Sequence, residues 1–376
     1  MNKAGIYLHI PFCKTKCIYC DFYSVTKRDD SIEKFVSCLI KEIELNKDKL
    51  SNFKFDTIFF GGGTPSVLTE KQLEKILNAL NKFYDLDKNI EVTLECNPGE
   101  INYEKLKYFR QIGVNRLSIG FQSFNEKILK FLGRLHSSEQ SISTFNHARK
   151  AGFDNINIDL IYDVPKQKVK DWKNDLFLGT SLEPEHISAY SLTVEKNTAL
   201  HSMVKNKTVL MPSEEIDKKM FLETIDYLEN KNFIHYEISN FSKKNKECKH
   251  NLHYWRLDPY LAFGPGAHGF DGIKRWWNKK SIDYYLNKLE RNVLPIESEE
   301  ILSKKDSFNE TIMNGLRLIE GAKIEKLDSY LDADIIKHLE PYIKKWPYIH
   351  NNGEKLTLKK EGLLFADEII ADLFLI

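Results

Sequence analysis

Short apolar strands and amphipathic helices alternate over roughly the first 195 residues of the chain. This alternation predicts a parallel sheet wrapped by helices, because successive parallel strands need a crossover connection between them. Apolar, β-branched and aromatic residues mark each strand. Six strands are expected, at residues 5–10, 57–60, 91–95, 116–120, 155–160 and 186–192.

The helices between these strands carry start signals of their own. Apolar residues recur at helical spacing over residues 31–45, with Ser31 as the expected N-cap. Thr69 and Gln72 form a capping-box sequence ahead of the next helix. Six strand and helix units predict an α/β fold, a partial (β/α)6 TIM-like barrel. In such barrels the side chains that do chemistry lie at the C-terminal ends of the strands.

The chain is long enough for this barrel and a smaller unit behind it. We expect the barrel at residues 1–215, an extension rich in histidine and aromatic residues at 216–296, and a C-terminal domain at 297–376. Amphipathic patterns at 308–318 and 324–330 precede a strand-like segment at 356–358. The last domain is therefore expected to be small and mainly helical, with the winged helix as its candidate type.

Charge and hydropathy exclude several classes of protein. The 55 lysines and arginines balance 54 aspartates and glutamates, so nucleic acid is not an expected partner. Neither a transmembrane-length apolar run nor a signal segment is found, so we expect a cytoplasmic protein; peripheral membrane contact stays open. Six cysteines, three of them close together, do not resemble a secreted disulfide framework.

Cys13, Cys17 and Cys20 follow the first expected strand in one loop, at the mouth of the predicted barrel. Thiolates are the usual ligands of iron-sulfur clusters, and a [4Fe-4S] cluster held by three of them keeps one iron open. The alternatives are a zinc site completed by a distant histidine and three unrelated thiols. Structural zinc usually collects ligand pairs from two places in a chain, so a single loop favours the cluster.

The spacing C-x3-C-x2-C resembles the signature of the radical S-adenosylmethionine (SAM) superfamily. Motifs at residues 7–13, 60–65, 95–98, 118–124, 133–134 and 157–160 resemble its coproporphyrinogen dehydrogenase-like branch. Within that branch, and over nearly the whole chain, the sequence most resembles the HemW-type haem chaperones. The resemblance implies three cofactors: the [4Fe-4S] cluster, SAM on its open iron, and haem.

The resemblance also implies a set of SAM-binding residues, several of them at strand ends. Consecutive glycines after the second strand let backbone groups approach a ligand closely. The pattern departs from that of relatives at Asp163, where Gly-Leu-Pro is usual and this chain has Asp-Val-Pro. The SAM residues implied are Tyr7, Tyr19, Gly62, Gly63, Thr64, Glu95, Gln122, Arg134 and Asp159.

Two histidines, a thiol and two aromatic residues lie within residues 248–255. Histidine is a common axial ligand of haem iron, and aromatic rings suit a porphyrin face. By spacing alone, these side chains are equally suited to packing a loop against the barrel. The segment resembles the His-Asn-x-x-Tyr-Trp motif associated with haem, which implies His250 as the haem ligand. His253 and Cys248 are weaker candidates for a second ligand.

The resemblance implies a haem chaperone that passes haem to an acceptor protein, with a flavodoxin or ferredoxin as electron donor and no catalytic residue singled out. The alternative is an oxygen-independent coproporphyrinogen III dehydrogenase in porphyrin biosynthesis. That enzyme carries a further cysteine where this chain has Phe22, and an N-terminal segment for which we expect no room before Cys13. A further alternative is a radical SAM enzyme with an unrelated substrate.

Overall fold

The computed structural model describes residues 2–331 and 334–375, and its centre is a run of six parallel strands. Each strand pairs with the next one along the chain. This order confirms the predicted partial barrel, because βα units place successive strands side by side. The strands are β1 (Lys3–Ile10), β2 (Lys54–Gly62), β3 (Leu86–Cys96), β4 (Arg116–Gln122), β5 (Ile156–Tyr162) and β6 (His186–Ser191).

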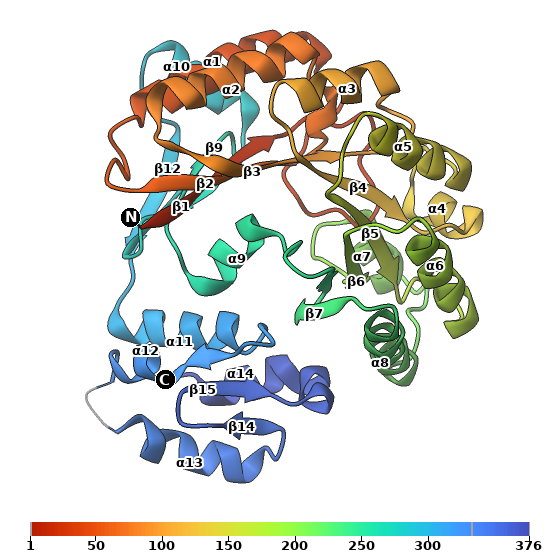
Figure 1. Ribbon diagram of the computed structural model, residues 1–376, viewed down its shortest axis with the longest axis vertical. Coiled ribbons are helices and arrows are strands. Elements are labelled where there is room, and N and C mark those ends of the chain that lie inside the picture. The colour runs from red at the N-terminus through yellow and green to blue at the C-terminus, as the bar shows by residue number, and fades with distance from the viewer. Residues whose placement is uncertain (1, 332–333, 376) are drawn as a thin grey trace.

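Helices cover the outer face of this sheet (Figure 1). Thr69 and Gln72 form the predicted capping box. Ser31 occupies the predicted N-cap position of the first helix, but its side chain makes no capping bond. Its Oγ instead accepts a hydrogen bond from Arg28 Nε at 3.3 Å. The covering helices are α1 (Ile32–Leu45), α2 (Glu70–Phe83), α3 (Tyr103–Gln111), α4 (Glu126–Leu132), α5 (Ser138–Lys150), α6 (Val169–Ser181) and α8 (Glu214–Asn230).

Further strands extend the parallel run at both edges. One of them, β9, runs parallel to β1, and the remaining additions are antiparallel. The helix α9 (Lys249–Arg256) lies beneath the arch of the sheet in Figure 1 and contacts β1 and β2. The added elements are β7 (Ile234–Glu237), β8 (Asn240–Ser242), β9 (Tyr260–Phe263), β10 (His268–Phe270), β11 (Lys274–Asn278), α10 (Ile282–Glu290) and β12 (Ile296–Ile301).

A second, antiparallel sheet of three strands belongs to the C-terminal region. A helix, a strand, two helices and a hairpin follow one another there, in agreement with the expected winged-helix type. The boundaries expected near residues 215 and 296 stay a prediction. The elements are α11 (Lys304–Gly315), β13 (Ala322–Lys323), α12 (Ile324–Asp328), α13 (Ile335–Lys345), β14 (Ile349–Asn351), β15 (Lys355–Leu358) and α14 (Ala366–Leu373).

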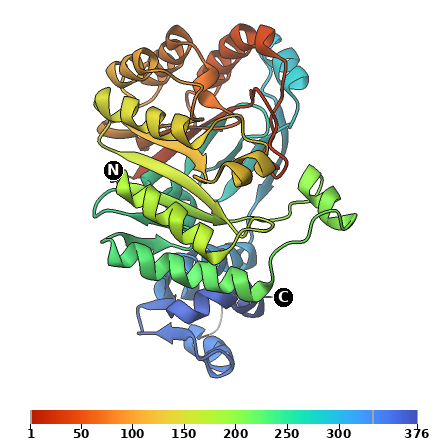
Figure 2. The same ribbon diagram turned by 90° about the vertical axis from the view of Figure 1, so that its right-hand side faces the viewer.

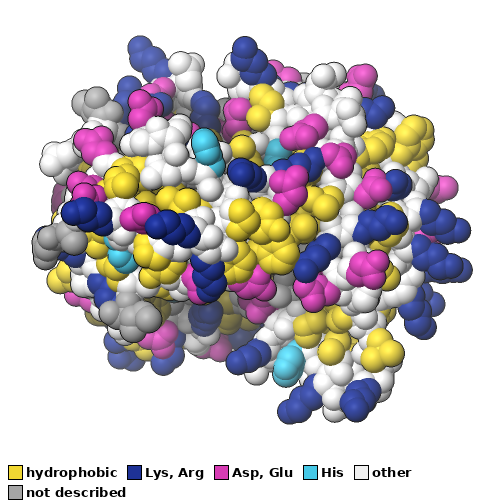
Figure 3. All heavy atoms as spheres, turned by 90° about the horizontal axis from the view of Figure 1, so that it is seen from below, with side chains coloured by type: hydrophobic (Ala, Val, Ile, Leu, Met, Phe, Trp, Pro, Cys, Tyr) yellow, Lys and Arg dark blue, Asp and Glu magenta, His cyan; other side chains and the backbone are white. Residues whose placement is uncertain are grey.

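The face seen from below in Figure 3 carries lysine and arginine side chains interspersed with aspartates and glutamates. This mixture agrees with the near balance of charge in the sequence. Within the described part of the chain, no helix has both the length and the apolar character needed to cross a lipid bilayer.

Candidate cofactor site at the cysteine loop

The inner wall of the barrel and the cysteine loop enclose a cavity of about 680 Å³. A cavity of this size suits a cofactor or another small-molecule ligand. Strands β1 to β6 supply most of the polar groups in its wall, as expected for a βα barrel. Every predicted cluster and SAM residue lines it: Cys13, Cys17, Cys20, Tyr7, Tyr19, Gly62, Gly63, Thr64, Glu95, Gln122, Arg134 and Asp159.

Two contacts anchor the backbone of the cysteine loop. The N–H of Cys13 donates to the Val25 carbonyl at 3.0 Å, and the N–H of Leu200 donates to the Ile18 carbonyl at 2.9 Å. Leu200 belongs to α7 (Ala199–Lys205), which projects from the barrel in Figure 2. A small hydrophobic cluster around Leu200 also packs Ile18 and Tyr19. Backbone hydrogen bonds and apolar packing therefore help to hold the loop in place.

Gly62 and Gly63 stand where the glycine loop passes the start of the cysteine loop. Gly62 has a φ of +107°, and a Cβ there would lie 2.5 Å from the His9 ring; a Cβ on Gly63 would lie 2.8 Å from the Ile10 carbonyl oxygen. The N–H of Gly62 donates to Glu95 Oε2 at 3.2 Å, and the N–H of Gly63 donates to the Ile10 carbonyl at 2.8 Å. Since these donors are occupied, the loop favours a ligand that itself donates, such as an ammonium group.

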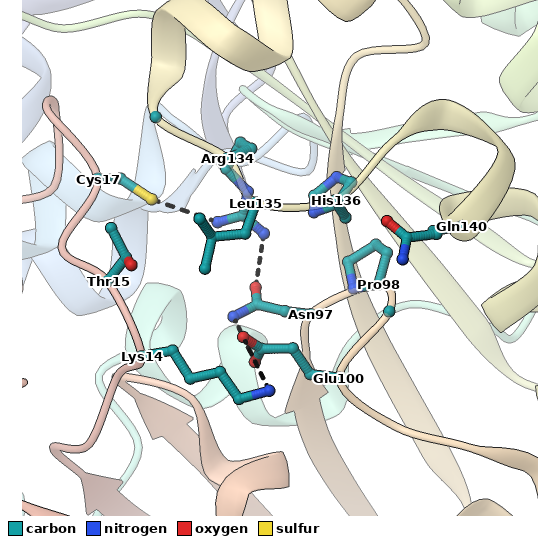
Figure 4. Close-up of a pocket in the computed structure, with 12 residues that line it drawn as sticks. Lys14, Thr15, Cys17, Asn97, Pro98, Glu100, Arg134, Leu135, His136 and Gln140 are labelled. Carbon is teal, nitrogen blue, oxygen red and sulfur yellow. Dashed lines mark hydrogen bonds and ion pairs between the residues drawn. The ribbon is translucent and has the colours of Figure 1, made fainter. Parts of the chain in front are cut away.

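Two of the thiols accept hydrogen bonds from Thr64 and Arg134, and Asn97 is hydrogen-bonded to both of these residues. Thr64 Oγ1 donates to Cys13 Sγ, and Arg134 Nη1 donates to Cys17 Sγ, both at 3.5 Å. Asn97 Nδ2 donates to Thr64 Oγ1 at 3.0 Å, and Asn97 Oδ1 accepts from Arg134 Nη2 at 2.6 Å. Figure 4 shows the Cys17, Arg134 and Asn97 part of this chain, beside a neighbouring pocket of about 130 Å³.

Asn97 was missed as a site residue by the sequence reasoning, although it belongs to the motif at residues 95–98. Its place directly after the strand that ends at Cys96 is the available signal. A polar residue just beyond a barrel strand lies where ligands bind.

The residues present fit a cluster with an exchangeable ligand. Burial raises the pKa of Cys13 and raises that of Cys20 to about 11, so a thiolate there requires a positive partner such as iron. Arg134 Nε is buried without a hydrogen-bond partner, which leaves a donor for a ligand. Among the described residues, no three His, Cys, Asp or Glu side chains converge closely enough to hold a metal ion, the three loop cysteines included, so the geometry does not separate zinc from a cluster.

Two half-buried carboxyl groups, Glu95 on β3 and Asp159 on β5, face the same cavity. Burial, together with repulsion from Asp159, raises the pKa of Glu95 to about 8. Burial also raises the pKa of Asp159, which accepts hydrogen bonds from Asn157 Nδ2 at 2.8 Å and Ser118 Oγ at 3.1 Å. A cationic ligand would relieve this repulsion, so the pair favours positively charged groups.

Tyrosine and glutamine side chains complete the wall. Gln122 follows a register shift at the end of β4 and has a φ of +67°. Tyr7 OH donates to His9 Nδ1 at 3.0 Å, because His9 Nε2 donates to the Tyr23 carbonyl at 2.8 Å. This chain connects the barrel to the residues after the cysteine loop. Burial raises the pKa of Tyr7 and of Tyr19, so both remain neutral.

The predicted haem residue, His250, is fully buried and does not line the cavity. Its Nδ1 shares a hydrogen bond with Thr57 Oγ1 and its Nε2 shares one with Tyr254 OH, both at 2.8 Å. The ring stacks on Phe59 with 5.2 Å between centroids. Burial lowers the pKa of His250 well below its usual range. Asn251 and Tyr254, on the same helix, do line the cavity.

The two weaker haem candidates, His253 and Cys248, are also buried. His253 Nε2 lies 2.7 Å from Asp56 Oδ1, and its Nδ1 lies 3.0 Å from Asp258 Oδ2. Burial alone would lower the pKa of His253, but these hydrogen bonds outweigh it and raise the pKa to about 9. Burial raises the pKa of Cys248 to about 12. A protonated imidazole and a neutral thiol are poor iron ligands in this arrangement.

The structure explains the departure from the pattern of relatives at Asp163. This residue has a φ of +61°, a left-handed conformation that favours glycine and that aspartate tolerates better than most residues. The turn expected of the glycine is therefore present. Phe22 stands where the dehydrogenases carry a further cysteine; it is 64% exposed and lines the cavity.

Comparison with known proteins agrees with this geometry. Residues 7–178 match the radical SAM superfamily. Heme chaperone HemW of Bacillus subtilis is 33% identical over 368 residues, which cover 96% of this chain and 97% of the relative. Heme chaperone HemW of Lactococcus lactis is 37% identical over 369 residues, which cover 96% and 95%. The chain belongs to the heme chaperone HemW family.

This membership confirms the predicted family, and the radical SAM superfamily implies SAM and a [4Fe-4S] cluster as cofactors. Among solved structures, coproporphyrinogen III oxidase (HemN) from Escherichia coli, described as a radical SAM enzyme, matches with a TM-score of 0.84. The match covers 99% of this chain and 90% of the other at 21% identity. At that identity the likeness supports the shared fold alone.

Proposed function

We propose that this protein is a haem chaperone that holds a SAM-bound [4Fe-4S] cluster, binds haem and passes it to an acceptor protein. One observation carries the proposal: the three cysteines, the predicted SAM residues, and Asn251 and Tyr254 of the haem-associated helix line one cavity. A shared cavity supports coupling between the cofactor and haem. When bound, the cluster with SAM supplies single-electron chemistry.

Charge supports the roles proposed for individual residues. Cys13, Cys17 and Cys20 are the proposed cluster ligands. The half-buried acids Glu95 and Asp159 suit the cationic groups of SAM, since both face the cavity. The unpaired Nε of Arg134 suits an acceptor on SAM. The remaining proposed SAM residues are Tyr7, Tyr19, Gly62, Gly63, Thr64 and Gln122.

His250 is the proposed haem ligand, and its hydrogen bonds define what ligation requires. Iron can reach Nε2 only after Tyr254 OH moves away from it. The hydrogen bond from His250 Nδ1–H to Thr57 Oγ1 can then remain, which keeps the proton on Nδ1 and leaves Nε2 free to bind. Haem binding through His250 therefore includes a shift of α9 or of the Tyr254 side chain.

Anaerobic reconstitution with iron and sulfide, followed by a haem titration, tests the proposal. A haem chaperone shifts the Soret band with about one haem per chain, and His250→Ala loses the shift while the exposed His350→Ala keeps it. Coproporphyrinogen decarboxylation with SAM and a reductant would instead establish the dehydrogenase. A titration without any Soret shift would favour a radical enzyme with an unrelated substrate.

The proposed partners are a haem-requiring acceptor protein and a flavodoxin or ferredoxin as electron donor. We place the protein in the cytoplasm. All six cysteines are free thiols, which suits a reducing compartment and an oxidation-sensitive cluster.

A further inference from the structure

Arg116, at the start of β4, is a buried cation in the cavity wall. It is 2% exposed and lines the cavity. Ser118, Gly120 and Gln122 line the same wall further along the strand. Because alternate strand residues face one side, Arg116 occupies the deep layer of the barrel, away from the strand ends that carry the cysteine loop.

The guanidinium of Arg116 has no hydrogen bond or ion pair with any other described residue, and its Nε is a buried donor without a partner. An arginine carries five N–H donors and stays charged in proteins. An unpaired buried charge is strongly unfavourable, so these donors require an acceptor inside the cavity.

Neighbouring acids do not supply that acceptor, because among the described residues none forms a hydrogen bond or an ion pair with the guanidinium. Asp159 accepts from Asn157 Nδ2 and Ser118 Oγ. Glu91 accepts from the backbone N–H groups of residues 249 and 250, at 3.4 and 3.3 Å. Burial opposes the charge on Arg116, but the surrounding groups Cys248, Glu91, Tyr236 and Asp159 outweigh it and raise the pKa of Arg116. The guanidinium therefore stays charged although its donors are unpaired.

We propose that Arg116 binds a carboxylate of a ligand that occupies the cavity. A carboxylate matches the planar fork of a guanidinium with two parallel hydrogen bonds, which an isolated water cannot do. This inference rests on the proposed function, whose two ligands both carry the group: SAM has one carboxylate and haem has two propionates.

The test removes the carboxylate from the ligand and the guanidinium from the protein. Full-length reconstituted protein is titrated with haem and haem dimethyl ester, and with SAM and decarboxylated SAM. For each protein, the factor is the Kd of the carboxylate-free ligand divided by the Kd of the intact ligand. For the ligand that Arg116 binds, this factor is larger in the wild type than in Arg116→Gln, by about tenfold or more. Arg116→Lys, which keeps the charge without the fork, gives an intermediate factor.

A matched control is Arg110→Gln on α3. Arg110 Nε donates to the Gly152 carbonyl at 3.1 Å on the surface, so this substitution is expected to leave every factor at the wild-type value. A smaller factor in Arg116→Gln for haem alone assigns a propionate, and one for SAM alone assigns the SAM carboxylate. Equal factors in wild type and variant for both ligands overturn the inference.

Two further outcomes keep the test decisive. If Arg116→Gln does not fold, Arg116→Lys completes the cycle. A wild type that binds each ligand and its carboxylate-free partner equally well overturns the inference without any variant. A wild type that binds neither haem nor SAM overturns the proposed function itself, so the two failures are distinguishable.

Discussion

The cysteine loop and the helix α9 approach the same cavity but present their polar groups in opposite ways. All three thiols of the loop line the cavity, and Thr64 and Arg134 already donate hydrogen bonds to two of the sulfurs. On α9, His250 is fully buried and both of its ring nitrogens are hydrogen-bonded. The thiols of the first region already face the cavity, whereas the second region must rearrange before His250 can bind anything.

This difference has a physical origin. Free thiols in a partly open loop lose little when a ligand replaces their weak hydrogen bonds. The imidazole of His250 must give up its hydrogen bond to Tyr254 OH before Nε2 can bind, and in a buried, dry environment that bond is stronger than in water. The proposed cluster site and the proposed haem site are therefore expected to differ in how readily each is filled.

The largest expected effect is the loss of iron and sulfide binding at the cysteine loop. Cys17→Ser removes a proposed cluster ligand, so iron and sulfide bound after anaerobic reconstitution fall to the background level. Cys38→Ser is the matched control, because Cys38 is a buried thiol on α1 remote from the loop, and it retains the wild-type content. A Cys17→Ser protein with full iron content would contradict the assignment of the loop.

The next effect concerns the electrostatic attachment of α9 to the barrel by His253. Its folded-state pKa of about 9 lies above the unfolded value of 6.5, so its stabilising contribution is fully present below pH 6.5 and is lost as the pH rises through 9. The shift corresponds to on the order of 3 kcal/mol in the free energy of unfolding. Urea unfolding of wild type and His253→Gln should therefore differ most near pH 6 and converge by about this amount near pH 10.

His350→Gln serves as the control for that measurement, since His350 is exposed on β14. Its difference from the wild type is expected to stay flat over the same range of pH. A pH-independent difference for His253→Gln would show that Asp56 and Asp258 do not hold a charged imidazole.

The smallest expected effect is a change in haem affinity when a hydrogen-bond partner of the buried His250 is removed. Tyr254→Phe removes the hydroxyl that competes with iron for His250 Nε2, so haem affinity should rise by about fivefold, the net value of one hydrogen bond. Thr57→Val, which removes the partner of Nδ1, should lower the affinity because it releases the tautomer. Haem titrations followed at the Soret band measure both. Lower affinity in Tyr254→Phe would mean that the hydroxyl contacts haem instead of blocking it.

Most of the fold followed from the sequence, because periodicity is a local property. Each of the six expected strands is present, and the Thr69 capping box forms as predicted. Ser31 takes the predicted N-cap position, but a short 3-10 turn at Asp29–Ser31 leads into the helix and leaves the serine backbone at helical angles, where its side chain does not cap. The motifs at strand ends also indicated the residues that line the cavity.

Other parts of the site depend on residues that meet only in three dimensions. Asn97 contacts Thr64 and Arg134 from a different strand end, so its role had no local signature beyond its position. Arg116 reads in the sequence as the first residue of an apolar strand, and only the surrounding barrel shows that its donors are unpaired. The same holds for His250, whose partners Thr57 and Phe59 lie on β2.

The sequence by itself determined the βα barrel, the three-cysteine loop and the family, because hydrophobic period and ligand spacing are carried by neighbouring residues. Only the tertiary structure decided that the thiols are open, that His250 is covered and that Arg116 faces the cavity unpaired. The reason is physical: burial and hydrogen-bond satisfaction belong to a side chain's surroundings, and those are built from segments far apart in the chain.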